Sequence, residues 1–188
     1  MIQSLTLLAT IRGLRMSLTL VLGGARSGKS AYAEKRAAET GNTVVYIATA
    51  QIHDEAIEKR VALHRETRPA EWQTVESPLE LASNIKQLAA KNVTLLVDCL
   101  TMWLTNLLCT DDATRLTQEV ESLLQSLSNV DGEIILVSNE VGLGVIPMGA
   151  LTREYVDTAG KLHQRIAAIA DNVVMVVAGI PMEVKGRV

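Results

Sequence analysis

The chain of 188 residues has few aromatic side chains and no excess of positive charge. Only 3% of the residues are aromatic and Phe is absent, so the core must be built from Leu, Val, Ile and Ala. The formal net charge is −3, and no basic stripe with interleaved aromatic residues occurs. Because proteins that bind nucleic acid carry such basic surfaces, we expect no nucleic-acid partner.

Cysteines and long apolar runs are scarce as well. Cys99 and Cys109 are the only cysteines, and their spacing matches neither a metal motif nor a C-x-x-C redox pair. Reduced thiols of this kind are typical of cytoplasmic proteins, and we expect the chain to be cytoplasmic. No apolar stretch approaches the roughly 20 residues that a membrane-spanning helix needs, so no membrane span is expected.

The first fifteen residues differ from the rest of the chain. Their two arginines, Arg12 and Arg15, follow the apolar run Leu5–Ile11, whereas a signal peptide carries its positive charge before such a run. We interpret residues 1–15 as a disordered extension or as the product of an upstream start. Residues 16–188 have the length of one domain with a full core, and no linker or repeat divides them.

A complete phosphate-binding loop of the pattern G-x-x-x-x-G-K-[ST] follows the apolar run Leu18–Leu22. A strongly helix-forming segment comes next, and strand, glycine loop and helix together are the context that this motif requires. We expect Lys29 to reach the β- and γ-phosphates of a nucleoside triphosphate and Ser30 to hold Mg²⁺. The nucleotide-binding residues predicted from the loop are Gly23, Gly24, Ala25, Arg26, Ser27, Gly28, Lys29 and Ser30.

Short apolar runs rich in β-branched residues alternate with longer helical stretches along the chain. This alternation predicts an α/β fold with a mostly parallel central sheet and helices on both faces. The expected strands are 18–22, 43–48, 93–97, 133–137 and 173–178, and the expected helices are 29–40, 53–65, 78–90, 112–128 and 150–170. Ligands of such sheets bind at the carboxyl ends of the strands.

Two of these strand ends carry polar residues. Asp98 directly follows an apolar strand, which is the Walker-B arrangement for Mg²⁺, although an Asp in this place can also cap the next helix. The phosphate loop favours the Mg²⁺ interpretation. The segment Ser138–Gly144 contains two closely spaced glycines, which indicate either backbone that approaches a ligand or an ordinary turn.

His64 lies among arginines, one helical turn after Arg60 and shortly before Arg68. Positive neighbours lower the pKa of an imidazole and keep it neutral and nucleophilic, and they also stabilise a transferring phosphoryl group. The spacing alone leaves open the alternative that His64 is a solvated surface residue. His53 stands about 16 Å away along a helix, so the two histidines cannot bind one metal ion.

The chain resembles the bifunctional adenosylcobinamide kinase / adenosylcobinamide-phosphate guanylyltransferase family of cobalamin biosynthesis. The resemblance covers residues 17–185. Its less specific part is the phosphate loop, and its most specific parts are Arg60–Trp72 and the turn Asn139–Gly144 with Pro147. The segment Tyr46–Gln51 and the run from 157 to 181 also carry it.

The resemblance implies a RecA-like P-loop NTPase domain in which His64 is the nucleophile that carries GMP and Lys29 the second catalytic residue. It implies a homo-oligomer, a trimer. Two positions depart from the family pattern, since Asp98 stands where Glu is common and His163 where Asn is expected. The further nucleotide-binding residues that it implies are Ala48, Thr49, Ala50, Arg65, Glu66, Thr67, Arg68, Glu76 and Asp98.

The implied activity has two steps. Adenosylcobinamide is phosphorylated with ATP or GTP, and GMP is then transferred from GTP through a guanylyl-histidine to give adenosylcobinamide-GDP. Mg²⁺ is the implied cofactor, held by Ser30 and Asp98. Two alternatives remain open, a plain small-molecule kinase without nucleotidyl transfer and a non-enzymatic regulatory P-loop module.

Overall fold

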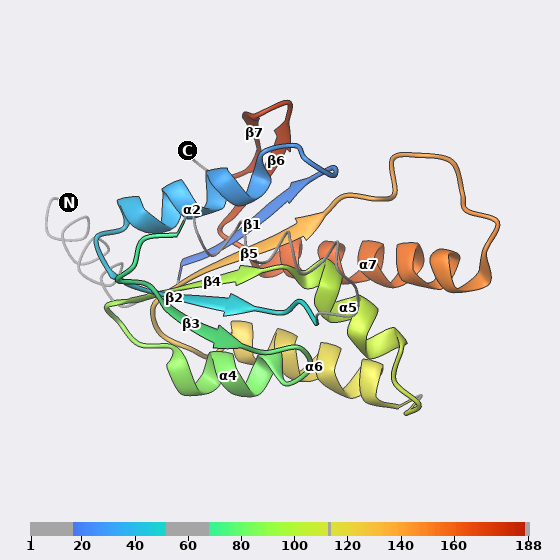
Figure 1. Cartoon of the computed structure of the whole chain (residues 1–188), viewed down its shortest axis with the longest axis horizontal. Coiled ribbons are helices and arrows are strands. Elements are labelled where there is room, and N and C mark those ends of the chain that lie inside the picture. The colour runs from blue at the N-terminus through green and yellow to red at the C-terminus, as the bar shows by residue number, and fades with distance from the viewer. Residues whose placement is uncertain (1–16, 52–67, 113, 187–188) are drawn as a thin grey trace, which may run out of the picture.

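In the part of the chain that the structure describes, seven strands form one central sheet in the order β3-β2-β4-β5-β1-β6-β7 (Figure 1). The computed structural model describes residues 17–51, 68–112 and 114–186. The expected helix at 53–65 and the extension at 1–15 lie outside these residues. The strands are β1 (Ser17–Gly23), β2 (Thr43–Ala48), β3 (Gln73–Glu76), β4 (Val93–Asp98), β5 (Glu133–Asn139), β6 (Asn172–Val177) and β7 (Ile180–Lys185).

All neighbouring strands from β3 to β6 pair in parallel, and only β7 runs antiparallel to its neighbour β6. The central strands are short apolar runs because both of their faces are covered. In β1, for example, Leu18, Leu20 and Val21 are fully buried. The prediction of a mostly parallel sheet is therefore confirmed.

Helices cover both faces of the sheet, as predicted (Figure 1). Among the described helices, α2 covers one face, and α4 to α7 cover the other. None of them is long and apolar enough to cross a bilayer. The helices are α2 (Lys29–Glu39), α4 (Leu81–Leu88), α5 (Leu100–Leu108), α6 (Arg115–Leu127) and α7 (Ala150–Ile169).

The alternation of side chains along each strand divides the interior into two cores. Leu20, Ile47 and Leu136 pack toward α4 to α7, where Trp103 of α5 is the largest fully buried side chain. The other core lies under α2 and is thinner. Aliphatic residues dominate both cores, as the scarcity of aromatic residues requires.

The five expected strands and the four expected helices within the described residues are confirmed. Three further elements were not predicted from the sequence, namely the strands β3 and β7 and the helix α5.

Candidate functional site

The carboxyl ends of the parallel strands meet at one edge of the sheet, on the right in Figure 1. The register pairs Gly23 of β1 with Asn139 of β5. Ala48 of β2 pairs with both Asp98 of β4 and Glu76 of β3. The structure thus brings the phosphate loop and the predicted residues of three other strands to one edge.

The phosphate loop connects β1 to α2 in a tightly folded conformation. Arg26 and Gly28 have φ angles of 57° and 93°, and the Ser27 N–H donates to the Gly24 carbonyl over 3.2 Å. The Lys29 ammonium turns back over the loop and donates to the same carbonyl over 3.3 Å. A Cβ atom on Gly23 would lie 2.4 Å from Ser27 Oγ and 2.6 Å from a backbone oxygen. Only glycine therefore fits at the start of the loop.

The turn between β6 and β7 supports the phosphate loop. The Gly179 N–H donates to the Ser27 carbonyl over 2.8 Å, and a Cβ atom on Gly28 would lie 3.1 Å from the Gly179 Cα. Ala178 and Gly179 both have positive φ, as a two-residue hairpin turn of type I′ requires. This support was not predicted from the sequence, because Ala-Gly is not one of the dipeptides that mark a two-residue hairpin and β7 shows no regular apolar run.

Asp98 and Arg68 come together around Tyr46 of β2. Asp98 lies on the same sheet face as Leu96, the face that α2 covers. The guanidinium carbon of Arg68 lies 3.3 Å from the centre of the Tyr46 ring. Burial, and after it the neighbouring Asp98 carboxylate, raise the pKa of Tyr46 well above its usual range. Two predicted site residues therefore share one buried tyrosine.

A hollow of about 460 Å³ lies beside Arg68. It contains two predicted nucleotide-binding residues, Arg68 and Glu76, together with an aromatic ring and a hydroxyl. Such a combination offers a cation, a carboxylate and a stacking surface to one ligand. The lining residues are Arg68, Pro69, Ala70, Trp72, Thr74 and Glu76.

Thr49, the central residue of the predicted segment 48–50, is fully buried. Its hydroxyl donates to the Cys99 carbonyl over 2.7 Å and accepts from the Cys99 N–H over 2.8 Å. Its carbonyl accepts from the Asn106 side chain over 2.8 Å. These bonds join the end of β2 to β4 and α5, and the contact of residues 48–50 with a nucleotide stays a prediction.

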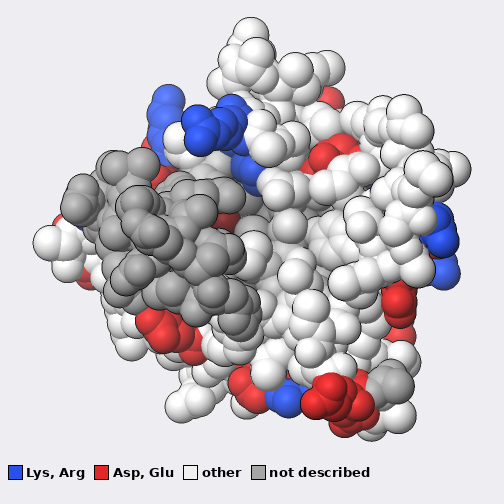
Figure 2. Space-filling view, turned by 45° about the vertical axis from the view of Figure 1, so that its right-hand side comes forward, with Lys and Arg blue, Asp and Glu red and all other residues white. Residues whose placement is uncertain are grey.

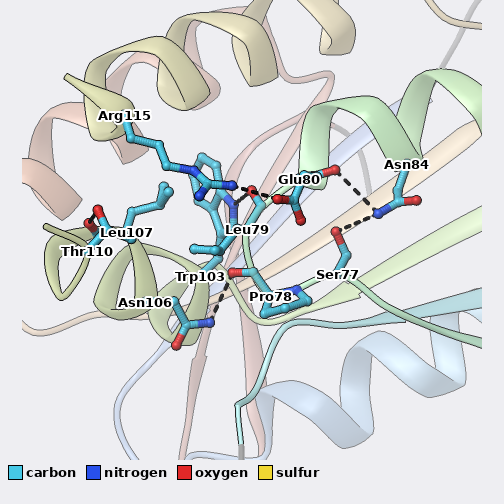
Figure 3. Close-up of polar contacts among 10 residues, drawn as sticks. All are labelled: Ser77, Pro78, Leu79, Glu80, Asn84, Trp103, Asn106, Leu107, Thr110 and Arg115. Carbon is cyan, nitrogen blue, oxygen red and sulfur yellow. Dashed lines mark hydrogen bonds and ion pairs between the residues drawn. The ribbon is translucent and has the colours of Figure 1, made fainter. Parts of the chain in front are cut away.

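Side chains of α4, α5 and α6 hold the segment that follows β3 (Figure 3). Asn106 donates to the Pro78 carbonyl over 3.0 Å, and the Trp103 indole N–H donates to the Leu79 carbonyl over 2.8 Å. The ion pair between Arg115 and Glu80 has an N···O distance of 2.5 Å. Residues of α5 and α6 therefore fix the ends of β2 and β3, and the sequence did not predict this role for them.

The predicted metal residues, Ser30 and Asp98, fit Mg²⁺ in their donor chemistry. A hydroxyl and a carboxylate are hard oxygen donors, and Mg²⁺ is commonly held by one or two such groups together with substrate phosphates. Within residues 17–51, 68–112 and 114–186, no group of three or more His, Cys, Asp and Glu side chains forms a metal cage. The donors therefore suit a metal ion that enters with its nucleotide.

Side chains of α5 and α7 contact the end of β5, just before the turn that follows it. The Asn139 N–H donates to Thr101 Oγ1 over 2.8 Å, and His163 Nε2 lies 2.8 Å from Ser138 Oγ. Burial lowers the pKa of His163, which the nearby Glu140 carboxylate partly offsets. His163 therefore links α7 to the end of β5.

An apolar loop projects beyond this turn. Its exposed side chains are Leu143, Val145, Ile146 and Met148, of which Val145 is 96% exposed. Figure 2, which brings this side of the molecule forward, shows a broad surface without charged side chains. The carboxyl ends of the parallel strands therefore lie next to an apolar surface.

The predicted nucleophile His64 and its neighbours Arg65, Glu66 and Thr67 lie outside the described residues, as does His53. The structure brings the phosphate loop, Asp98, Arg68 and Glu76 to one edge, and it does not place His64. The roles predicted for residues 64–67 stay predictions.

The chain is similar in sequence to one family of known proteins. Residues 19–184 match the family described as cobinamide kinase / cobinamide phosphate guanyltransferase. The bifunctional adenosylcobalamin biosynthesis protein CobP of Pseudomonas aeruginosa is 57% identical over 89% of this chain and 97% of its own length. CobU of Escherichia coli is 36% identical over 89% of this chain and 99% of its own.

The α/β fold with its mostly parallel sheet also occurs in a solved structure of unrelated sequence. A solved structure from Pyrococcus horikoshii OT3 superposes with a TM-score of 0.57 at 10% identity, over 90% of this chain and 86% of that one. At this identity the likeness bears on the fold alone.

Proposed function

Since the chain belongs to the cobinamide kinase / cobinamide phosphate guanyltransferase family, we propose that it phosphorylates adenosylcobinamide and then transfers GMP to the product. Its relatives are bifunctional adenosylcobalamin biosynthesis proteins, which supports an enzymatic role. The observation that carries the proposal is the gathering of the phosphate loop, Asp98, Arg68 and Glu76 at one edge of the sheet.

In the kinase step, the corrinoid hydroxyl attacks the γ-phosphorus of ATP or GTP, the bond to the β–γ bridging oxygen breaks, and a nucleoside diphosphate leaves. The loop N–H groups and the start of α2 bind the phosphates. Lys29 moves from its bond with the Gly24 carbonyl to the phosphate oxygens and stabilises the charge of the transition state. Mg²⁺, when held by Ser30 and Asp98, neutralises phosphate charge.

In the transfer step, a neutral nitrogen of His64 attacks the α-phosphorus of GTP, and pyrophosphate leaves. The guanylyl-histidine then reacts with an oxygen of the corrinoid phosphate, the P–N bond breaks, and adenosylcobinamide-GDP forms. Covalent catalysis of this kind divides one transfer into two in-line displacements. His64 precedes Arg68 by four residues. An extended chain of four residues spans at most about 14 Å, so the Cα atoms of His64 and Arg68 cannot lie farther apart than this.

The test is the mass of the intact protein after incubation with GTP and Mg²⁺. The wild-type protein should gain the mass of one GMP, and peptide mapping should locate it on His64. His64→Ala should lose the adduct and the GMP transfer but keep much of the kinase activity, since γ-phosphoryl transfer uses the phosphate loop. His53→Ala serves as the matched histidine control and should keep both activities.

The outcomes separate the alternatives. Corrinoid phosphorylation without an adduct would identify a plain small-molecule kinase. Nucleotide binding without corrinoid-dependent turnover would indicate a regulatory module. An adduct that survives His64→Ala would refute the assignment of the nucleophile.

We further propose that the chain assembles into a homotrimer. The support is the strand β7, which ends the sheet within the described residues and exposes the apolar side chains of Ile180, Met182 and Val184. An exposed apolar edge strand is a surface on which another chain can pair.

A further inference from the structure

We propose that Tyr46 is a positioning residue that holds the Asp98 carboxylate with its hydroxyl and the Arg68 guanidinium with its ring face, so that both charges stay oriented toward bound nucleotide. The proposal rests on the proposed function only in taking a magnesium nucleotide as the ligand. Tyr46 itself would touch neither the nucleotide nor the metal ion.

The ring face of Tyr46 fixes Arg68. The guanidinium carbon lies 3.3 Å from the ring centre, and Tyr46 is only 3% exposed, so one face of the guanidinium is shielded from water. A cation over an aromatic ring is attracted by the electrons of the ring, and the attraction grows with desolvation. Arg68 also lines the open hollow that contains Glu76. The stack therefore presents the guanidinium to a ligand in that hollow.

The hydroxyl of Tyr46 faces Asp98. Tyr46 pairs with Leu96 across β2 and β4, so Asp98, two residues farther along, lies on the same face and nearer the carboxyl end. The Asp98 carboxylate lies close enough to Tyr46 to act on it by its charge and as a side-chain hydrogen-bond partner. A phenol hydroxyl donates to a carboxylate, which can only accept, so this bond orients the Asp98 carboxylate.

Tyr46 also separates two opposite charges. Both Asp98 and Arg68 act electrostatically on it, yet within the described part of the chain they form no ion pair with each other. A guanidinium and a carboxylate at contact distance form strong charge-assisted hydrogen bonds with each other, which would occupy groups that could otherwise contact phosphate or Mg²⁺. The tyrosine between them keeps each charge available.

The experiment measures GTP binding by calorimetry, once with Mg²⁺ and once with EDTA. Tyr46→Phe keeps the ring and loses the hydroxyl, so it should weaken binding about three- to tenfold with Mg²⁺ and leave binding in EDTA unchanged. Tyr46→Leu loses the ring and should weaken binding about threefold or more in both conditions. Tyr32→Phe is the control, since Tyr32 packs on the same core and should bind GTP as the wild type does.

A double variant tests whether Tyr46 acts through Asp98. If it does, Tyr46→Phe should add nothing to the loss caused by Asp98→Asn alone. Equal losses with and without Mg²⁺, fully multiplicative losses in the double variant, or unchanged binding in Tyr46→Phe would each overturn the proposal. A wild-type protein that binds GTP but forms no adduct would refute the transfer reaction and leave this binding test decisive.

Discussion

At the residue scale, a few buried polar side chains connect the strand ends that form the site. Asn106 is the clearest example, because its amide nitrogen donates to Thr49 on one side and to Pro78 on the other. The bond to Thr49 is buried and the bond to Pro78 is partly buried, and Asn106 is only 5% exposed. A single side chain therefore ties the end of β2 to the segment after β3.

We expect Asn106→Leu to destabilise the protein by about 3 kcal/mol, since it leaves two carbonyls in the interior without their donor. For a domain of this size, the melting temperature should fall by roughly 6 to 12 °C. Asn129→Leu is the matched control, because Asn129 is exposed and its side chain donates to the Gln125 carbonyl at the surface. A melting curve of Asn106→Leu that coincides with that of the control would contradict the prediction.

His163 should make stability depend on pH. Burial lowers its pKa in the folded state, whereas the unfolded chain binds the proton near pH 6.5. The unfolded state therefore holds more protons below pH 6.5, and the stability that neutral His163 provides is lost as pH falls from there through the lower folded pKa.

His163→Asn removes the titrating ring and keeps a group that can bond to Ser138. We expect the melting temperature of the variant, relative to the wild type, to be constant above about pH 7 and to rise as the pH falls from 6.5 to 5.5. The measurement is a series of melting curves across this range. A difference that stays constant with pH would show that His163 does not contribute.

At the scale of elements, the long helix α7 contains a weak point. Gly160 lies in its interior, and a Cβ atom there would meet nothing within 4 Å. Glycine in a helix interior lowers stability through the greater freedom of the unfolded chain.

Gly160→Ala should therefore stabilise the protein by about 1 kcal/mol, or roughly 2 to 4 °C in melting temperature. Gly132→Ala should instead destabilise the protein, because φ is 103° and the new Cβ would lie 2.4 Å from the Ala90 carbonyl oxygen. Thermal unfolding of both variants checks the prediction. Destabilisation by Gly160→Ala would mean that its side of α7 is covered by something else.

The elements that the sequence analysis missed lack the pattern on which it relied. β3 has only four residues, three of them polar and exposed, and β7 is exposed throughout, so neither shows the apolar run of a buried strand. α5 begins two residues after β4 ends and is itself largely apolar, so no polar turn marked the change from strand to helix. Buried central strands were predictable because burial on both faces dictates their composition.

The candidate site was predictable where a motif defines it. The phosphate loop and Asp98 stand at strand ends, and the parallel topology brings strand ends together. Tyr46, Asn106 and Gly179 were not assigned, because their importance arises from contacts between residues far apart in the chain. No local spacing encodes such contacts.

At the scale of the whole molecule, β7 ends the sheet without a further partner strand among the described residues. We expect the wild-type protein to elute as an assembly of three chains in size-exclusion chromatography with light scattering. Replacing both Met182 and Val184 with Lys should shift it toward the monomer, because two charges cannot be buried in an apolar contact. A monomeric wild-type protein at all concentrations would contradict the proposed trimer.

The position of β1 in the sheet determines when the phosphate loop gains its tertiary contacts during synthesis. β1 lies between β5 and β6, so Ser17 pairs with Glu133 and Thr19 with Asn172. Chains leave the ribosome from the amino-terminal end, and contacts between distant segments form late. The phosphate loop precedes the β6–β7 hairpin in the chain, so it gains the Gly179 bond only after that hairpin has been synthesised. A nascent chain that still lacks the hairpin therefore also lacks this support for its phosphate loop.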